Sequence, residues 1–81
     1  MIRNGTIVRW KHKLTTLPIH DINSNVVYKV ENGDTLQLVE LELDFDTESI
    51  MVLYKNGIGY IAREWIYCGE GLRRARYEFV V

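Results

Sequence analysis

SIMVLYKNGIGYIA, residues 49–62, is the stretch of sequence that decides the fold. Its first half is apolar on both faces and contains β-branched and aromatic residues, which is typical of a buried strand. Asn56-Gly57 then provides two residues that tolerate positive φ, the strongest short-range signal for a β-hairpin. We therefore predict a hairpin that turns at Asn56-Gly57 and has a central strand over residues 49–54.

The position of the turn predicts which residues of the hairpin face each other. The expected pairs are Tyr54 with Gly59, Leu53 with Tyr60, Val52 with Ile61, and Met51 with Ala62. Side chains alternate between the two faces of a strand. The inner face should therefore carry Ile50, Val52 and Ile61, and the other face Met51, Leu53, Ile58 and Tyr60.

The rest of the chain also consists of short strand patterns separated by turns. Outside the hairpin, we expect strands at residues 6–13, 26–30, 35–45, 66–67 and 74–81, with an extended piece at 17–20 inside a long loop. The apolar positions of residues 35–45 change phase midway, which a bulge near Leu38-Val39 would reconcile. Residues 62–65 are too few for an α-helix and are expected to form one 3₁₀ turn. The last strand should pair near the first.

Length and composition favour one small globular domain. The chain has 81 residues, of which 47% are hydrophobic and 26% charged, so one hydrophobic core is expected. The single cysteine, Cys68, cannot form an internal disulfide, which favours a reducing compartment. We expect no signal peptide and no membrane span, and therefore a cytoplasmic protein.

Two stretches resemble a known family. VENGDTLQLV, residues 30–39, and GYIAREWI, residues 59–66, are similar in order and spacing to bacterial SH3-type domains. The resemblance implies an all-β, SH3-like barrel of five to seven short antiparallel strands, with its core over residues 6–67. The strand that alternation predicts near the C-terminus, at about 73–81, would be an addition to the usual domain. It also implies that Ile61 and Ile66 are core residues and that Tyr60 and Trp65 lie on the ligand-facing side.

Patterns typical of catalysis are not found. His12 and His20 have no Cys or His partner at metal spacing, and no nucleophile, metal or cofactor site is predicted. Asp44, Asp46 and Glu48 alternate in a loop and have the oxygen atoms that a cation such as calcium needs. We favour the alternative interpretation, a solvated acidic turn, which also discourages pairing between sheet edges.

Two functions remain open, and neither is enzymatic. The first is a protein-interaction module, whether a regulator, an inhibitor or an assembly component, including one encoded by a virus. Large apolar side chains often anchor interfaces, and the candidate anchors are Tyr60, Trp65, Leu53 and Met51. The second is nucleic-acid binding, or binding of an acidic partner, through the basic residues of the first and last strands, Arg9, Lys11, Lys13, Arg74 and Arg76. The net charge of −1 argues against the nucleic-acid alternative.

Overall fold

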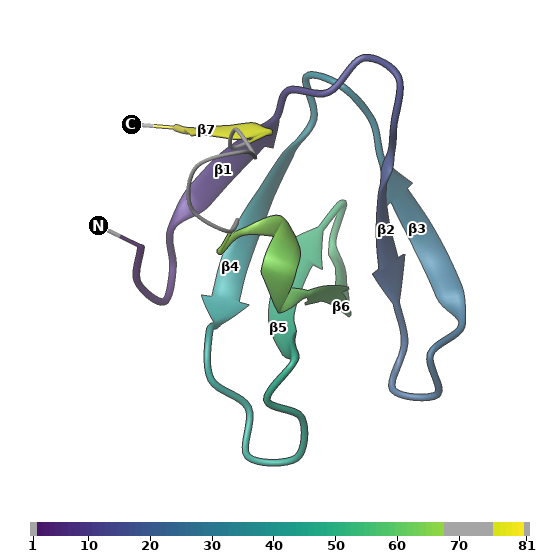
Figure 1. Ribbon diagram of the computed structural model, residues 1–81, viewed down its shortest axis with the longest axis vertical. Coiled ribbons are helices and arrows are strands. Elements are labelled where there is room, and N and C mark those ends of the chain that lie inside the picture. The colour runs from purple at the N-terminus through teal and green to yellow at the C-terminus, as the bar shows by residue number, and fades with distance from the viewer. Residues whose placement is uncertain (1, 68–75, 81) are drawn as a thin grey trace.

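The computed structural model describes residues 2–67 and 76–80, which form one antiparallel sheet of seven strands with one 3₁₀ turn. The elements are β1 (Ile7–Trp10), β2 (Leu17–His20), β3 (Val26–Val30), β4 (Thr35–Glu40), β5 (Ser49–Tyr54), β6 (Gly57–Ala62), η1 (Arg63–Trp65) and β7 (Tyr77–Phe79). The strand order is β3-β2-β6-β5-β4-β1-β7, so β5 is the central strand, as predicted. Figure 1 shows β2 and β3 on one side of the molecule, β1, β4 and β7 on the other, and η1 between them.

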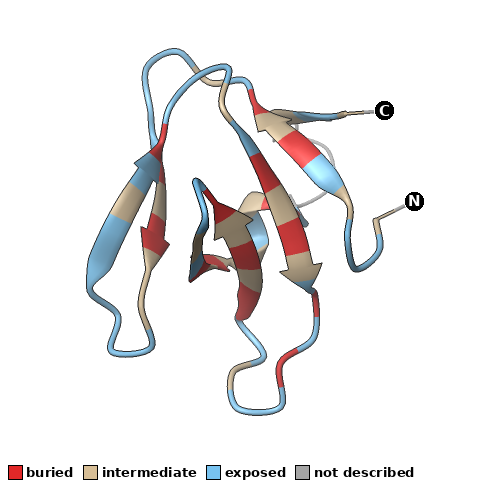
Figure 2. Ribbon diagram, turned by 180° about the vertical axis from the view of Figure 1, so that it is seen from behind, coloured by how far each residue is buried: buried red, intermediate tan, exposed pale blue. Residues whose placement is uncertain are grey.

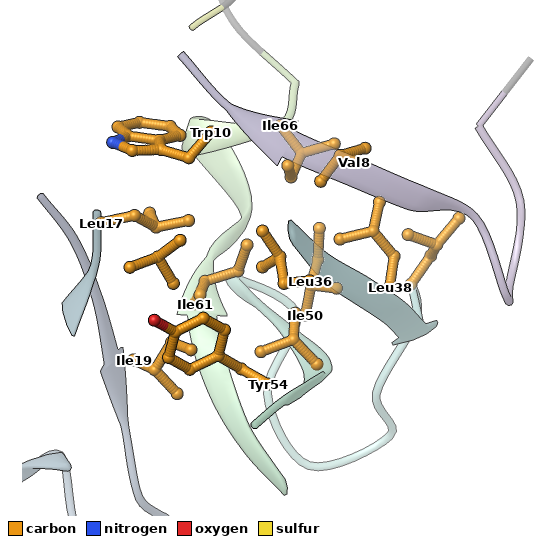
Figure 3. Close-up of a cluster of buried hydrophobic side chains, with 13 residues drawn as sticks. Val8, Trp10, Leu17, Ile19, Leu36, Leu38, Ile50, Tyr54, Ile61 and Ile66 are labelled. Carbon is orange, nitrogen blue, oxygen red and sulfur yellow. The ribbon is translucent and has the colours of Figure 1, made fainter. Parts of the chain in front are cut away.

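The hydrophobic core lies on the concave face of this curved sheet. Buried and less buried residues alternate along β1, β2, β4 and β5, as the period of two in a strand requires (Figure 2). Figure 3 shows side chains from several strands of the sheet meeting in one cluster, including Trp10, Leu17, Ile50 and Ile61. Each large apolar side chain of this kind contributes roughly 1.5–3 kcal/mol when it is fully buried. This packing and the sheet hydrogen bonds hold the fold together.

The sheet is not closed into a barrel. Within the described residues, β3 pairs only with β2 and β7 pairs only with β1, so both ends of the sheet are edges. The 3₁₀ turn η1 follows β6, and Ile66 after it is buried in the core. The all-β fold, the antiparallel strands and the 3₁₀ turn of the sequence prediction are thereby confirmed. Within the described ranges, no helix is long and apolar enough to cross a membrane.

The register predicted for the central hairpin is wrong, because the turn lies one residue earlier in the chain than expected. Tyr54 pairs with Gly57, Val52 with Gly59 and Ile50 with Ile61, which leaves Lys55 and Asn56 as the two turn residues. Their φ angles are 47° and 66°, so both adopt the left-handed conformation that a type I′ turn requires. Moving the turn by one residue changes each partner by two positions and therefore preserves the faces. Accordingly, Ile50, Val52 and Ile61 are buried, as predicted.

The two glycines of β6 are required by close packing. A Cβ at Gly57 would collide with the Tyr28 phenol, and a Cβ at Gly59 would collide with Cγ2 of Ile19. Gly59 is buried where β6 passes β2, so a larger residue would displace a fully buried isoleucine. The lack of a side chain at Gly57 thus allows the close contact with Tyr28 and is not required by the turn itself.

The boundaries of four other predicted strands differ from the structure. The strand predicted at 6–13 covers only Ile7–Trp10, and the one predicted at 35–45 ends at Glu40. The expected bulge is confirmed by a register shift between Leu38 and Glu40. No strand forms at 66–67, because the 3₁₀ turn leaves Ile66 in a helical conformation. Of the predicted terminal strand, Tyr77–Phe79 pairs with β1 as expected, and residues 74, 75 and 81 lie outside the described residues.

Candidate functional site

The outer face of the central hairpin carries a group of apolar side chains in contact with solvent. Met51 pairs with Tyr60 and Leu53 pairs with Ile58 across β5 and β6. Ile58 is 54% exposed, and the other three side chains are half-buried. Phe45, which is 61% exposed, packs edge-on against Tyr60 with ring centroids 5.8 Å apart. We call these five residues the hairpin face.

The structure therefore brings together three of the four predicted anchor residues, Met51, Leu53 and Tyr60. Phe45 is a member that the sequence did not identify, because it was expected to continue a strand with Leu41 and Leu43. The chain leaves the sheet after Glu40, so Leu41 and Leu43 are buried while Phe45 turns outward. No local signal separates Phe45 from Leu41 and Leu43, because each of the three lies between two carboxylates in the sequence.

Trp65, the fourth predicted anchor, has different neighbours. Its ring packs edge-on against the fully buried Trp10, with centroids 5.6 Å apart and an interplanar angle of 81°. The Arg76 guanidinium lies 5.9 Å from the centroid of the Trp65 ring. Trp65 is half-buried and supports the core. Its part in binding stays a prediction.

An acidic segment borders the hairpin face. Residues 40–48 contain five carboxylates and no basic residue, and Glu40 pairs with Met51. In the described part of the chain, the sole ion pair joins Arg9 to Glu78, so none of the five carboxylates has a basic partner within ion-pair distance. The Ser49 hydroxyl and the Glu48 amide donate hydrogen bonds that lower the pKa of Asp46 and stabilise its ionised form. The border of the face is therefore negatively charged.

A small pocket adjoins the Tyr60 end of the hairpin face. Its volume is about 170 Å³, and its walls include His20, Asp21, Phe45, Asp46 and Tyr60. The His20 and Tyr60 rings lie 6.1 Å apart at 32°. His20 is placed there by the end of β2, which pairs with β6 through His20 and Tyr60. We call this the Tyr60 pocket.

Each of the two histidines makes a hydrogen bond to a nearby residue of its own loop. Nδ1 of His12 accepts a hydrogen bond of 2.9 Å from the Thr15 amide, and Nδ1 of His20 donates one of 3.0 Å to the Asp21 carbonyl. Among residues 2–67 and 76–80, no group of three His, Cys, Asp or Glu side chains is arranged to hold a metal ion. Cys68 lies outside the described residues.

The first and last strands are neighbours, as predicted. The Lys11 amide donates a 2.7 Å hydrogen bond to the Arg76 carbonyl, which brings these two basic residues to one end of the sheet. Arg9, however, forms a 3.1 Å ion pair with Glu78 on the neighbouring strand, so its charge is compensated. Lys13 is exposed beyond β1, and Arg74 lies outside the described residues. The structure thus joins part of the predicted basic surface.

Comparison with known proteins gave no relative. No protein-family model, curated protein or solved structure matches the chain. The geometry of the hairpin face, its acidic border and the Tyr60 pocket therefore carries the functional argument.

Proposed function

We propose that this protein is a non-catalytic interaction module that binds a protein partner through the hairpin face. The observation that carries the proposal is the apolar outer surface of two central strands, with Ile58 and Phe45 more than half exposed. Contiguous exposed apolar surface on a small domain marks an interaction site more often than a single exposed residue does. Methionine and aromatic residues are also enriched at the cores of interfaces.

The position of the face on paired strands suits it to binding. Met51 and Leu53 extend from β5, which pairs with β4 on one side and β6 on the other. On β6, Tyr60 pairs with both β5 and β2, and Ile58 pairs with β5. Rigid backbone loses less conformational entropy when a partner binds. The partner would gain the burial energy of these side chains without ordering a loop first.

The finer fold assignment is part of the same proposal. We infer an SH3-like arrangement, because the Gly-Tyr-Ile stretch of β6 leads into a 3₁₀ turn and because Ile61 and Ile66 are buried. These features belong to residues 59–66, one of the two stretches on which the sequence resemblance depends. A cytoplasmic location remains a prediction from the sequence.

The test is affinity capture from the native host with one charge placed in the face. Ile58→Lys adds a charge at an exposed strand position, so the fold should be retained. Truncation of an interface anchor costs about 2 kcal/mol or more, and we expect at least a roughly 30-fold loss of affinity for the captured protein.

The matched control is Val27→Lys, which replaces another exposed apolar strand residue, 46% exposed, outside the hairpin face. Its affinity for the captured protein should stay within about twofold of the wild type, as expected for substitutions outside the anchors. Equal binding by Ile58→Lys and the wild type, with both proteins folded by circular dichroism, would refute the proposal.

Nucleic-acid binding is the second candidate, supported by the adjacency of Lys11 and Arg76 at the end of β1 and β7. Phosphate contacts make such binding strongly dependent on salt. Retention on a DNA column that is lost in Lys11→Glu with Arg76→Glu would favour this candidate. Passage of the wild type through the column at low salt would eliminate it.

A further inference from the structure

We propose that the Tyr60 pocket receives a cationic side chain, an arginine, from the protein partner. The inference rests on the proposed function, because the pocket shares Tyr60 and Phe45 with the hairpin face. It adds a chemical requirement that the apolar face alone does not impose: the partner must present a positive charge beside its apolar residues.

Aromatic rings form two walls of the pocket. Phe45 meets Tyr60 edge-on at an interplanar angle of 87°, and the His20 ring is tilted 32° from the Tyr60 ring, with the two centroids 6.1 Å apart. The face of an aromatic ring attracts a cation, most often arginine. A planar guanidinium can also stack on such a ring, which an ammonium cannot do.

Two fixed carboxylates provide the opposite charge. Asp21 Oδ1 accepts hydrogen bonds of 2.9 Å from the backbone amides of Asn23 and Asn25. Asp46 Oδ1 accepts one of 2.9 Å from the backbone amide of Glu48. Asp46 also accepts a hydrogen bond from the Ser49 hydroxyl, which is the largest cause of its lowered pKa, and the bond from Asn25 is the largest cause for Asp21. These bonds orient both carboxylates. A carboxylate has about four acceptor positions, so each retains capacity for a guanidinium.

The pocket combines negative charge with a fixed ring. The carbonyl of Asp21 can only accept a hydrogen bond, so Nδ1 of His20 donates it, and this bond fixes the His20 ring beside Tyr60. With its two carboxylates, the pocket offers acceptors to a cation, and their charge would repel the phosphates of a nucleic acid. The volume of about 170 Å³ is of the size of a side chain.

A small arginine derivative tests the pocket without the partner. N-acetyl-arginine methylamide is titrated into ¹⁵N-labelled protein, and N-acetyl-citrulline methylamide, which has nearly the same shape and no charge, serves as the reference probe. We expect the arginine probe to shift the amide signals of His20, Phe45 and Tyr60 and to bind about tenfold more tightly than citrulline, as a cation–π contact combined with a charge partner allows.

Two variants assign the binding to the pocket. Asp46→Asn retains an oxygen for the Glu48 amide but removes one of the two negative charges, and should reduce the preference for arginine over citrulline. Asp44→Asn removes the same charge from the same segment, outside the walls of the Tyr60 pocket, and should retain that preference. Equal binding of the two probes by the wild type, or arginine-induced shifts at other residues, would overturn the inference. Such a result would not refute the proposed function of the hairpin face, because Ile58→Lys tests that function separately, by binding to the captured partner.

Discussion

Because of the hydrogen bond between Tyr54 and Asp34, we predict that the wild type is more stable than Tyr54→Phe and that this difference depends on pH. Tyr54 is only 4% exposed, and its hydroxyl donates a 2.6 Å hydrogen bond to Asp34 Oδ2. A hydrogen bond to a charged group contributes about 1.5–3 kcal/mol. Asp34 is half-buried and becomes hydrated when the hydroxyl is removed, so Tyr54→Phe should destabilise the protein by about 1–2 kcal/mol at pH 7.

The greater unfolding free energy of the wild type, compared with Tyr54→Phe, should disappear at alkaline pH. Burial, and then the bond to Asp34, raises the pKa of Tyr54 from 10.0 to about 12. The stabilisation from a raised pKa is fully present below pH 10 and is lost as the pH rises toward 12. Two pKa units correspond to about 2.7 kcal/mol, about half of which is lost by pH 11. The phenylalanine variant has no group to ionise there, so the two proteins should be equally stable near pH 11.

At acid pH, the hydrogen bond between Tyr54 and Asp34 should also stop stabilising the wild type, for a different reason. The Tyr54 hydroxyl, followed by the Glu31 amide, lowers the pKa of Asp34 below its ordinary value of 3.8. The stabilisation from a lowered pKa is present above the unfolded value and is lost as the pH falls through the folded value. The difference between wild type and Tyr54→Phe should therefore narrow below about pH 4.

The measurement is urea unfolding of both proteins, followed by tryptophan fluorescence, at pH values from 3 to 11. Tyr60→Phe is the control, because it removes one phenol from the outer face and leaves the bond to Asp34 in place. A difference between wild type and Tyr54→Phe that stays constant from pH 4 to pH 11 would show that this bond is not made as the structure describes.

Substitutions at three further positions test the packing of the sheet and its central turn. Gly59→Ala should destabilise by about 1–3 kcal/mol in urea unfolding, because the new methyl group overpacks against Ile19; additivity of Gly59→Ala with Ile19→Ala in a double-mutant cycle would contradict this contact. Asn56→Ala should lower the unfolding free energy by about 1 kcal/mol and Asn56→Gly by less than half of that, since φ is 66° there; equal effects would place the turn elsewhere. Trp65→Ala should destabilise by about 2–4 kcal/mol through loss of packing on Trp10; an unchanged thermal midpoint would make Trp65 a surface residue.

The sequence predicts the strands well wherever the signal is local. Alternation places Val8 and Trp10 inward, and the phase change at Leu38-Val39 correctly locates a bulge. The turn of the central hairpin is predicted one residue too late, because Asn56-Gly57 is the preferred dipeptide while packing against Tyr28 requires Gly57 inside the strand. The face assignments survive this error because side chains alternate with a period of two.

The candidate site depends on contacts that local patterns do not encode. The Tyr60 pocket combines residues 20–21, 45–46 and 60 from three separate segments. Their meeting depends on β2 pairing with β6, a pairing between strands distant in sequence. The ionised border of the face could be predicted from composition, since residues 40–48 contain no basic residue. The outward turn of Phe45 could not, because it follows from the end of β4 at Glu40.

Hydrogen exchange of the protein with its captured partner tests the central claim most directly. The proposed function predicts that the partner protects β5 and β6 together with residues 44–46, and leaves β1 and β7 as they are in the free protein. Protection confined to β1 and β7, with β5 and β6 unchanged, would contradict the assignment of the hairpin face as the binding surface.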